Sequence, residues 1–296
     1  MNNVATTHDF EIAGYAFRFE DETSGAGLRF PDGFEPFRTT LQHTVDGHYH
    51  FVNEDQRPSD PPHADHTYVC CDTWRFGQTT NGRYYMDIQY APNNFWQPAA
   101  YLTQNFNSGL IFPKRYNANT LFPYSIFFPI DEQILLNRMA LLHGALIHSC
   151  GINYEGKAVL FCGKSGAGKS TIADLWRAEN ASLMNDDRII IRPLDGKYVA
   201  AATPWHGTVD EINPVMLPIA AVFHLHQATE NRVEAIPFPQ SAQRIIANAI
   251  APFYLKSSMN KVLQTLTTAM QTIPSYNLYF QPNQDAIDTC RRILDV

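Results

Sequence analysis

Residues 163–170, with the sequence GKSGAGKS, constrain the fold of this chain more than any other segment. They match the pattern G-x-x-x-x-G-K-[ST] in full. An apolar run at 158–162 precedes them and predicts a buried strand, and a helix is predicted from Ser170 to about Arg177. The glycines permit a turn whose backbone N–H groups point inward, and the helix adds the positive end of its dipole. We therefore predict a loop that binds the phosphates of a nucleoside triphosphate.

Individual residues of this loop have separate predicted roles. Lys169 can reach the β- and γ-phosphates, and the Ser170 hydroxyl can hold Mg²⁺. The predicted cofactors are ATP and Mg²⁺. An accidental glycine-rich turn is the alternative, which the flanking strand and helix disfavour. The predicted nucleotide-binding residues are Gly163, Lys164, Ser165, Gly166, Ala167, Gly168, Lys169, Ser170 and Thr171.

Two adjacent acids, Asp186 and Asp187, follow a short apolar run at 182–184. If that strand runs parallel to the strand before the loop, its carboxyl end lies beside the loop. One carboxylate could then hold Mg²⁺, and the other could accept a proton from a hydroxyl nucleophile. A solvated Asp-Asp turn is the alternative interpretation.

Composition indicates a folded globular protein, with 45% hydrophobic and 17% charged residues. The net charge of −7 disfavours a nucleic-acid partner, since such proteins usually carry a basic surface. The first residues show no signal-peptide pattern, and no apolar stretch approaches about 18 residues, so no membrane partner is expected. The five cysteines are odd in number and include the vicinal pair Cys70-Cys71, which favours reduced thiols and a cytoplasmic location.

Two domains are predicted, one at 1–127 and the other at 128–296. The first is β-rich, with expected strands at 11–19, 48–53, 68–76 and 84–89 and a hairpin around Asn81-Gly82. The second is α/β. Its expected helices are at 132–142, 170–177, 240–251, 256–272 and 285–294, and its expected strands at 145–150, 158–162, 182–184, 188–192, 198–202, 218–226, 233–237 and 276–280.

Histidines leave several alternatives open. His143 and His148 would face opposite sides of a strand, so one could line the site while the other packs, and we choose His143. A turn at 205–207 could form a substrate lip or could simply pack its Trp. A zinc site is not predicted from the N-terminal histidines and cysteines, because their spacings fit no tetrahedral pattern. These residues are His43, His48, His50, His63, His66, Cys70 and Cys71.

The segments HGALIHSCGINYEGKAVLFCGKSGAGKSTIADLW and LMNDDRIII resemble the C-terminal catalytic domain of HPr kinase/phosphorylase and related kinases. The resemblance is good over about residues 140–195. It implies a P-loop domain with the fold of ATP-dependent phosphoenolpyruvate carboxykinase. It also implies that His143 and Gly144 lie near the phosphates, that Asp186 is the general base, and that Asp187 is the acid associated with the metal.

The segment at 202–208 departs from that family, because it stands where HPr kinases carry their glycine-rich signature. In this respect the chain looks more like the HPr-kinase-related proteins of peptide biosynthesis clusters, including kinases of lasso peptides. The expected activity is therefore phosphoryl transfer from ATP to a hydroxyl of a peptide or protein, with Asp186, Lys169 and His143 as catalytic residues. A small-molecule kinase and a nucleotide-gated scaffold without turnover are the alternatives. The HPr kinases form hexamers, so an oligomer is compatible with the resemblance.

Overall fold

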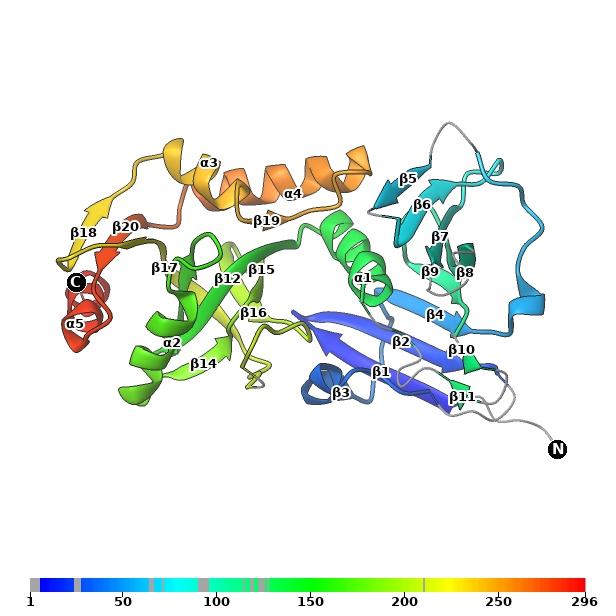
Figure 1. Cartoon of the computed structure of the whole chain (residues 1–296), viewed down its shortest axis with the longest axis horizontal. Helices are drawn as coiled ribbons and strands as arrows, with labels where there is room; N and C mark the ends of the chain where they lie inside the picture. Colours follow the sequence, from blue (N-terminus) through cyan, green and yellow to red (C-terminus); the bar gives the residue numbers. More distant parts are fainter. Residues whose placement is uncertain are drawn as a thin grey trace. The chain divides into compact units, whose positions relative to one another are not determined.

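The computed structural model shows a mixed α/β protein with two large sheets and few helices (Figure 1). It describes residues 6–23, 28–63, 67–70, 72–89, 96–113, 115–117, 120–121, 126, 128–209 and 211–295. The chain divides into two compact units. Unit 1 comprises Met1–Glu11 and Tyr15–Arg138, and unit 2 comprises Ile12–Gly14 and Met139–Val296. The chain passes between the units within helix α1 (Ile130–Leu141), a little after the predicted boundary at residue 127.

Unit 1 is built on a nine-stranded sheet with the order β3-β1-β2-β4-β9-β8-β7-β6-β5. The pairs β2–β4 and β4–β9 are parallel, and the pairs from β9 to β5 are antiparallel. Two 3₁₀ helices (Asp32–Phe37 and Glu54–Gln56) and a small sheet of β10 (Arg115–Asn117) and β11 (Thr120–Leu121) accompany it. The strands of the large sheet are β1 (Thr6–Ile12), β2 (Tyr15–Asp21), β3 (Arg38–Thr39), β4 (Gly47–Phe51), β5 (Tyr68–Cys70), β6 (Trp74–Gln78), β7 (Tyr84–Gln89), β8 (Trp96–Leu102) and β9 (Ser108–Ile111).

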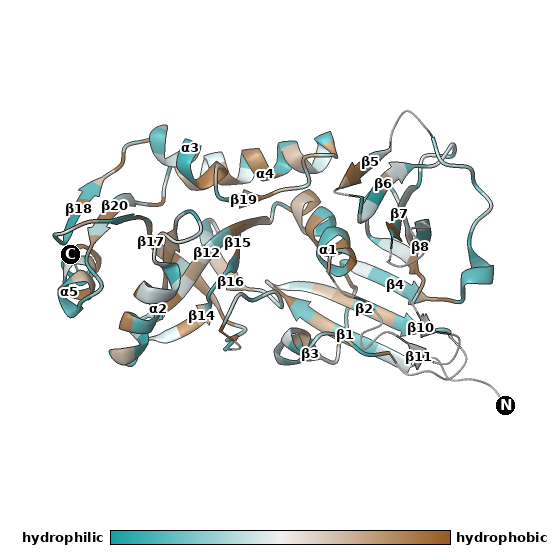
Figure 2. Cartoon of the chain, in the orientation of Figure 1, coloured by the Kyte–Doolittle hydropathy of each residue, from teal (hydrophilic) through white to brown (hydrophobic). Residues whose placement is uncertain are grey.

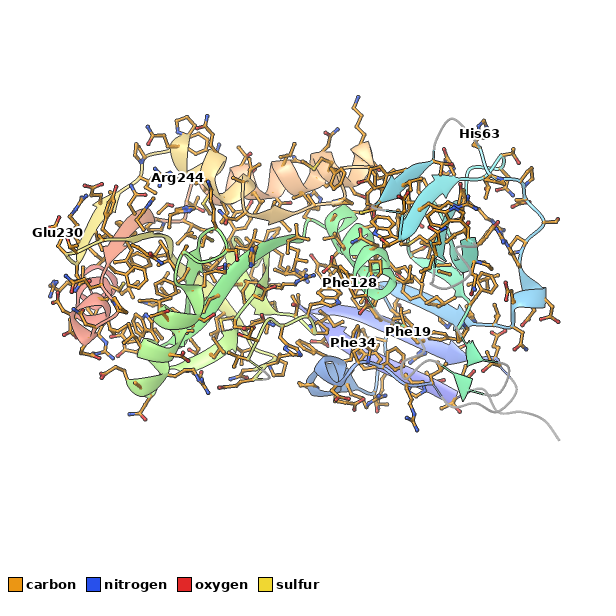
Figure 3. All side chains as sticks on the ribbon, viewed as in Figure 1. Phe19, Phe34, His63, Phe128, Glu230 and Arg244 are labelled. Carbon is orange, nitrogen blue, oxygen red and sulfur yellow. The ribbon has the colours of Figure 1, made fainter. Side chains whose placement is uncertain are left out.

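Aromatic side chains form the core on one face of this sheet. Phe10, Phe19 and Phe34 are fully buried, and Phe19 and Phe34 are labelled in Figure 3. The rings of Phe10 and Phe34 meet edge to face, with their centroids 5.4 Å apart. Alternation along β4 buries Tyr49 and Phe51 on this side and leaves His48 and His50 half-buried on the other. The second face of β2 and β4 is therefore free to carry polar groups.

Unit 2 contains a sheet with the order β13-β12-β15-β16-β17-β20-β18. β17 pairs with β13 as well as with β16. The strands β13, β12, β15, β16 and β17 therefore form a closed ring of pairings. The strands are β12 (Ala145–Tyr154), β13 (Lys157–Cys162), β14 (Ser182–Asn185), β15 (Arg188–Leu194), β16 (Lys197–Ala202), β17 (Met216–Gln227), β18 (Arg232–Ala235), β19 (Ala249–Ile250) and β20 (Ser275–Phe280).

The helices of unit 2 are α2 (Lys169–Ala178), α3 (Gln240–Ile246), α4 (Lys256–Ala269) and α5 (Gln284–Leu294). Trp176 of α2 is fully buried in a core with Phe161 of β13, Phe223 of β17 and Ile287 of α5. Hydrophobic residues alternate with hydrophilic ones along α4, as expected of a helix with one face on a core (Figure 2). None of the helices in the described ranges is long and apolar enough to cross a bilayer.

Three predicted elements differ from the structure. The strand predicted at 68–76 is divided into β5 and β6 by a turn in which Asp72 has a positive φ angle of 53°. The strand predicted at 11–19 is wrong, because Ala13 and Gly14 adopt positive φ angles of 55° and 71° and turn the chain from β1 into β2. The helix predicted at 240–251 ends early, since Ala249 and Ile250 pair with β12 as β19. Local turns thus interrupt the two predicted strands, whereas pairing with the distant strand β12 overrides helix propensity at 249–250.

Candidate functional site

The glycine-rich segment forms a loop between β13 and α2, as predicted. Gly166 and Gly168 have φ angles of 79° and 102°, a region that L side chains rarely adopt. A Cβ on Gly168 would lie 2.7 Å from the Phe280 ring, and one on Gly163 would lie 2.7 Å from the Ala167 Cβ. The loop thus depends on its glycines both for backbone conformation and for space.

Lys169, the first residue of α2, folds back over this loop. Its Nζ donates a hydrogen bond to the Gly163 carbonyl at 3.1 Å, and Gln227 donates to the Gly166 carbonyl at 2.8 Å. Ser170 and Thr171 are exposed in the first turn of α2, whose N–H groups have no partner within the helix. The loop therefore offers an ammonium group, a hydroxyl and the positive end of a helix dipole at one place.

The strands that lead to the loop and to the acidic pair run parallel, which is the condition under which the sequence places the two side by side, but these strands are not neighbours. Both β13 and β14 pair antiparallel with β12, which lies between them. Ser149 of β12 pairs with Cys162, the last residue before the loop, and its N–H donates to the Asp187 carbonyl at 3.0 Å. The loop and the acidic pair thus flank one residue of β12, about 10 Å apart if each strand spacing is about 4.8 Å.

Asp186 is almost entirely buried, with 5% of its surface exposed. Its Oδ1 accepts the N–H of Gly207 at 2.8 Å, and its Oδ2 accepts the N–H groups of Thr208 and Val209 at 2.9 and 3.1 Å. The carboxylate thus anchors the segment that follows β16. Sequence reasoning missed this role, because the three donors lie more than twenty residues away along the chain.

Asp187 makes a different set of contacts. Its Oδ1 lies 2.7 Å from the Nε2 of His148, and its Oδ2 lies 3.2 Å from the Nε of Arg188. Asn185 holds the turn, since its Oδ1 accepts the N–H groups of Asp187 and Arg188, each at 2.8 Å. Asp187 and His148 are partly exposed, so this pair is the more accessible part of the acidic site.

The structure brings His148 to the acidic pair and leaves His143 elsewhere. His143 is exposed in the turn between α1 and β12, where its carbonyl accepts a hydrogen bond from Thr265 at 3.4 Å. The rise of about 3.3 Å per residue puts Ala145, at the start of β12, about 10 Å from His148. The contacts therefore favour His148 over the histidine chosen from the sequence.

The segment at 203–209 covers the acidic pair. The Asn185 amide donates to the carbonyls of Thr203 and Trp205 at 3.1 and 2.9 Å. Trp205 is only 8% exposed, which agrees with a packed side chain rather than a substrate lip.

A further polar group lies at the carboxyl end of β17. His224 pairs with Cys162 in the sheet, and burial, aided by the positive charge of Arg244 and by His226, lowers the pKa of His224 to about 4. Arg244 of α3, which is labelled in Figure 3, donates to the Asn277 side chain, which also contacts the His226 ring at 3.0 Å. His224 is thus a neutral group at pH 7, directly beside the end of the strand that leads into the loop.

Comparison with known proteins assigns the chain to a family. The family model described as SynChlorMet cassette protein ScmC matches residues 131–283, just over half of the 296 residues. The chain belongs to this ScmC family, and the matched range contains the glycine-rich loop, His148 and the acidic pair.

Other comparisons add little. No curated protein matches the chain. One solved structure, the HPr(Ser) kinase/phosphatase from Coxiella burnetii, is 8% identical, and the match covers 51% of this chain and 92% of that chain with a TM-score of 0.30.

Proposed function

We propose that this protein is an ATP- and Mg²⁺-dependent kinase that transfers the γ-phosphoryl group to a hydroxyl, that of Ser or Thr in a peptide or protein. One observation carries the proposal. The glycine-rich loop with Lys169 and the acidic pair with His148 flank the same residue of β12, Ser149. Phosphoryl transfer needs both a phosphate cradle and a group that handles the proton of the acceptor, within reach of each other.

The loop residues fit a triphosphate. Gly166 leaves the backbone at the middle of the loop uncovered, since no atom lies within 4 Å of the place of a Cβ on this residue. Lys169 would leave the Gly163 carbonyl to pair with phosphate oxygens, which are stronger acceptors because they are charged. Ser170 and Asp187 are the proposed Mg²⁺ ligands, and the bound ion would neutralise part of the negative charge of the phosphates.

We assign the proton acceptor to His148 rather than to Asp186. Both oxygens of Asp186 already accept backbone N–H groups, whereas His148 is partly exposed and its Nε2 is held by Asp187. A carboxylate that binds one ring nitrogen orients the imidazole and leaves the other nitrogen able to accept a proton. Asp186 then acts as a positioning residue that holds the segment at 207–209 over the site.

The peptide or protein acceptor rests on the resemblance of the motifs to HPr-kinase-related proteins. A small-molecule hydroxyl remains the alternative acceptor. The test is incubation of the purified chain with Mg-ATP and pools of peptides or metabolites, followed by measurement of ADP release and by mass spectrometry for the gain of one phosphate. Tight nucleotide binding without transfer to either pool would favour a nucleotide-gated scaffold instead.

Variants test the individual roles. Lys169→Ala should weaken ATP binding, and unchanged affinity would contradict the loop assignment. His148→Gln should abolish transfer while nucleotide affinity changes little, and His143→Gln is its matched control. If His143→Gln abolishes transfer and His148→Gln does not, the catalytic histidine is the one chosen from the sequence.

A further inference from the structure

A cluster of two histidines and a glutamate lies on unit 1, whereas the residues of the proposed kinase site belong to unit 2. Glu20 is on β2, and His48 and His50 are on β4. One carboxylate oxygen of Glu20 and one ring nitrogen of each histidine all lie within 4.8 Å of one another. The opposite faces of the same strands carry the fully buried Phe19 and Tyr49, so the core holds the backbone of the cluster in place.

Strand pairing produces this arrangement. β2 and β4 are parallel neighbours (Figure 1), and in their register Glu20 pairs with His50. Side chains two residues apart on one strand share a face, so His48 and His50 project together toward the side of Glu20. The sequence shows only the His-x-His spacing, because the glutamate comes from a strand nearly thirty residues earlier.

The distances match those between ligands of one ion. Bonds of about 2.05 Å at tetrahedral angles place two ligand atoms about 3.3 Å apart. The His48 Nε2 lies 3.1 Å from one Glu20 oxygen, and the His50 Nδ1 lies 3.6 Å from the other. The His50 Nδ1 also lies 2.6 Å from an oxygen of Glu22, directly after β2. A small displacement of these side chains would put four ligand atoms around one centre.

The environment of the His48 Nε2 atom also suits a metal ligand. This atom is buried and makes no hydrogen bond within the described residues, although it is close to the Glu20 carboxylate. A cation held between this buried nitrogen and the Glu20 carboxylate, 3.1 Å away, would give the nitrogen a directed bond in place of the hydrogen bond that it lacks.

Charge also favours a cation here. Among the described residues, the ion pairs of Glu20 and Glu22 are those with His48 and His50. The nearby Arg18 guanidinium is occupied by Asp9, with which it forms two hydrogen bonds of 2.8 and 2.9 Å. With neutral imidazoles, the cluster therefore carries two negative charges that a divalent cation would balance.

We propose that Glu20, His48 and His50 bind a divalent transition-metal ion of the Zn²⁺ type, with Glu22 as the fourth ligand. Imidazole nitrogens select such ions over Mg²⁺ and Ca²⁺, which prefer all-oxygen sites. The ion would link β2 to β4. This parallel pair connects β3, β1 and β2 at one edge to the remainder of the sheet. The ion differs from the Mg²⁺ of the proposed kinase site in ligand type, and its ligands belong to unit 1 rather than to unit 2.

The test titrates the full chain, stripped with EDTA, with Zn²⁺ by calorimetry in the presence of excess Mg²⁺. We expect one Zn²⁺ per chain that Mg²⁺ does not displace. Glu20→Gln and His48→Ala should each weaken binding at least about tenfold, since even outer-shell changes at metal sites have effects of that size. His43→Ala is the matched control, because His43 is exposed and outside the cluster, and it should bind as the unmodified chain does.

A second measurement guards against variants that fail to fold. Glu20→Gln keeps the size of the side chain, and its circular dichroism should match that of the unmodified chain. Zn²⁺ should raise the unfolding temperature of the unmodified chain and of His43→Ala, but not that of Glu20→Gln. Absence of stoichiometric binding, or equal Zn²⁺ affinity in all variants, would overturn the proposal.

Discussion

Acidification should destabilise this protein through His224. The side chain is 5% exposed, its Nε2 makes no hydrogen bond in the described structure, and burial, with Arg244 and His226, lowers its pKa to about 4. In the unfolded chain the pKa returns to about 6.5. Between these values the unfolded state binds more protons than the folded state, so the free energy of unfolding falls as the pH falls from about 6.5 to 4.

The expected size follows from the two pKa values. At pH 7.5 the effect is close to zero, and at pH 5.0 it amounts to about 2 kcal/mol for a pKa of about 4 in the folded state. His224→Gln removes the titrating group and with it this part of the pH dependence. The unmodified chain should therefore lose about 2 kcal/mol more than His224→Gln between pH 7.5 and 5.0.

Urea unfolding at the two pH values measures this difference directly. His43→Gln serves as the control, because His43 is exposed and its loss should leave the pH dependence as it is in the unmodified chain. A direct check is the imidazole resonance of His224 in NMR, which should titrate near pH 4. Equal pH dependence of His224→Gln and the unmodified chain would refute the argument.

Three further predictions concern the site and the core. Gly168→Ala should destabilise the chain by about 2 kcal/mol and weaken ATP binding, because it combines a φ of 102° with a clash against Phe280; Gly156→Ala, with a φ of 76° and no atom nearby, gives the cost of the backbone alone in the same urea experiment. Asp186→Asn should lower the free energy of unfolding by about 2–3 kcal/mol, because the NH₂ group of an amide cannot accept the N–H groups that one carboxylate oxygen now accepts. Asp187→Asn should lower it by about 1 kcal/mol or less, because Asp187 is partly exposed. Equal losses would contradict the anchoring role of Asp186. A thiol reagent at pH 8 should leave Cys150, Cys162 and Cys290 unmodified in the folded chain, because burial raises the pKa of all three, that of Cys162 to about 11; rapid labelling of any of them without denaturant would show that the core is open.

Local chemistry accounts for the part of the site that the sequence predicted well. The loop at 163–168 and its flanking strand and helix are encoded by neighbouring residues, since the glycines, Lys169 and the apolar run act over a few positions. The same holds for the turn after β14, where Asn185 binds the N–H groups two and three residues ahead. Such features can be predicted because conformational preference and hydrogen bonding operate between adjacent residues.

Long-range pairing decided the rest. The sequence alone determined that a loop of the phosphate-binding type stands between a strand and a helix, and that two acids follow the next strand. Only the tertiary structure shows that β12 lies between those strands. It also shows that His148, rather than His143, contacts Asp187, and that Asp186 accepts hydrogen bonds from the N–H groups of residues 207–209. It also joined Glu20 to His48 and His50 across a parallel pair. The physical reason is that strand order and register depend on burial of whole faces by distant segments, which no local pattern specifies.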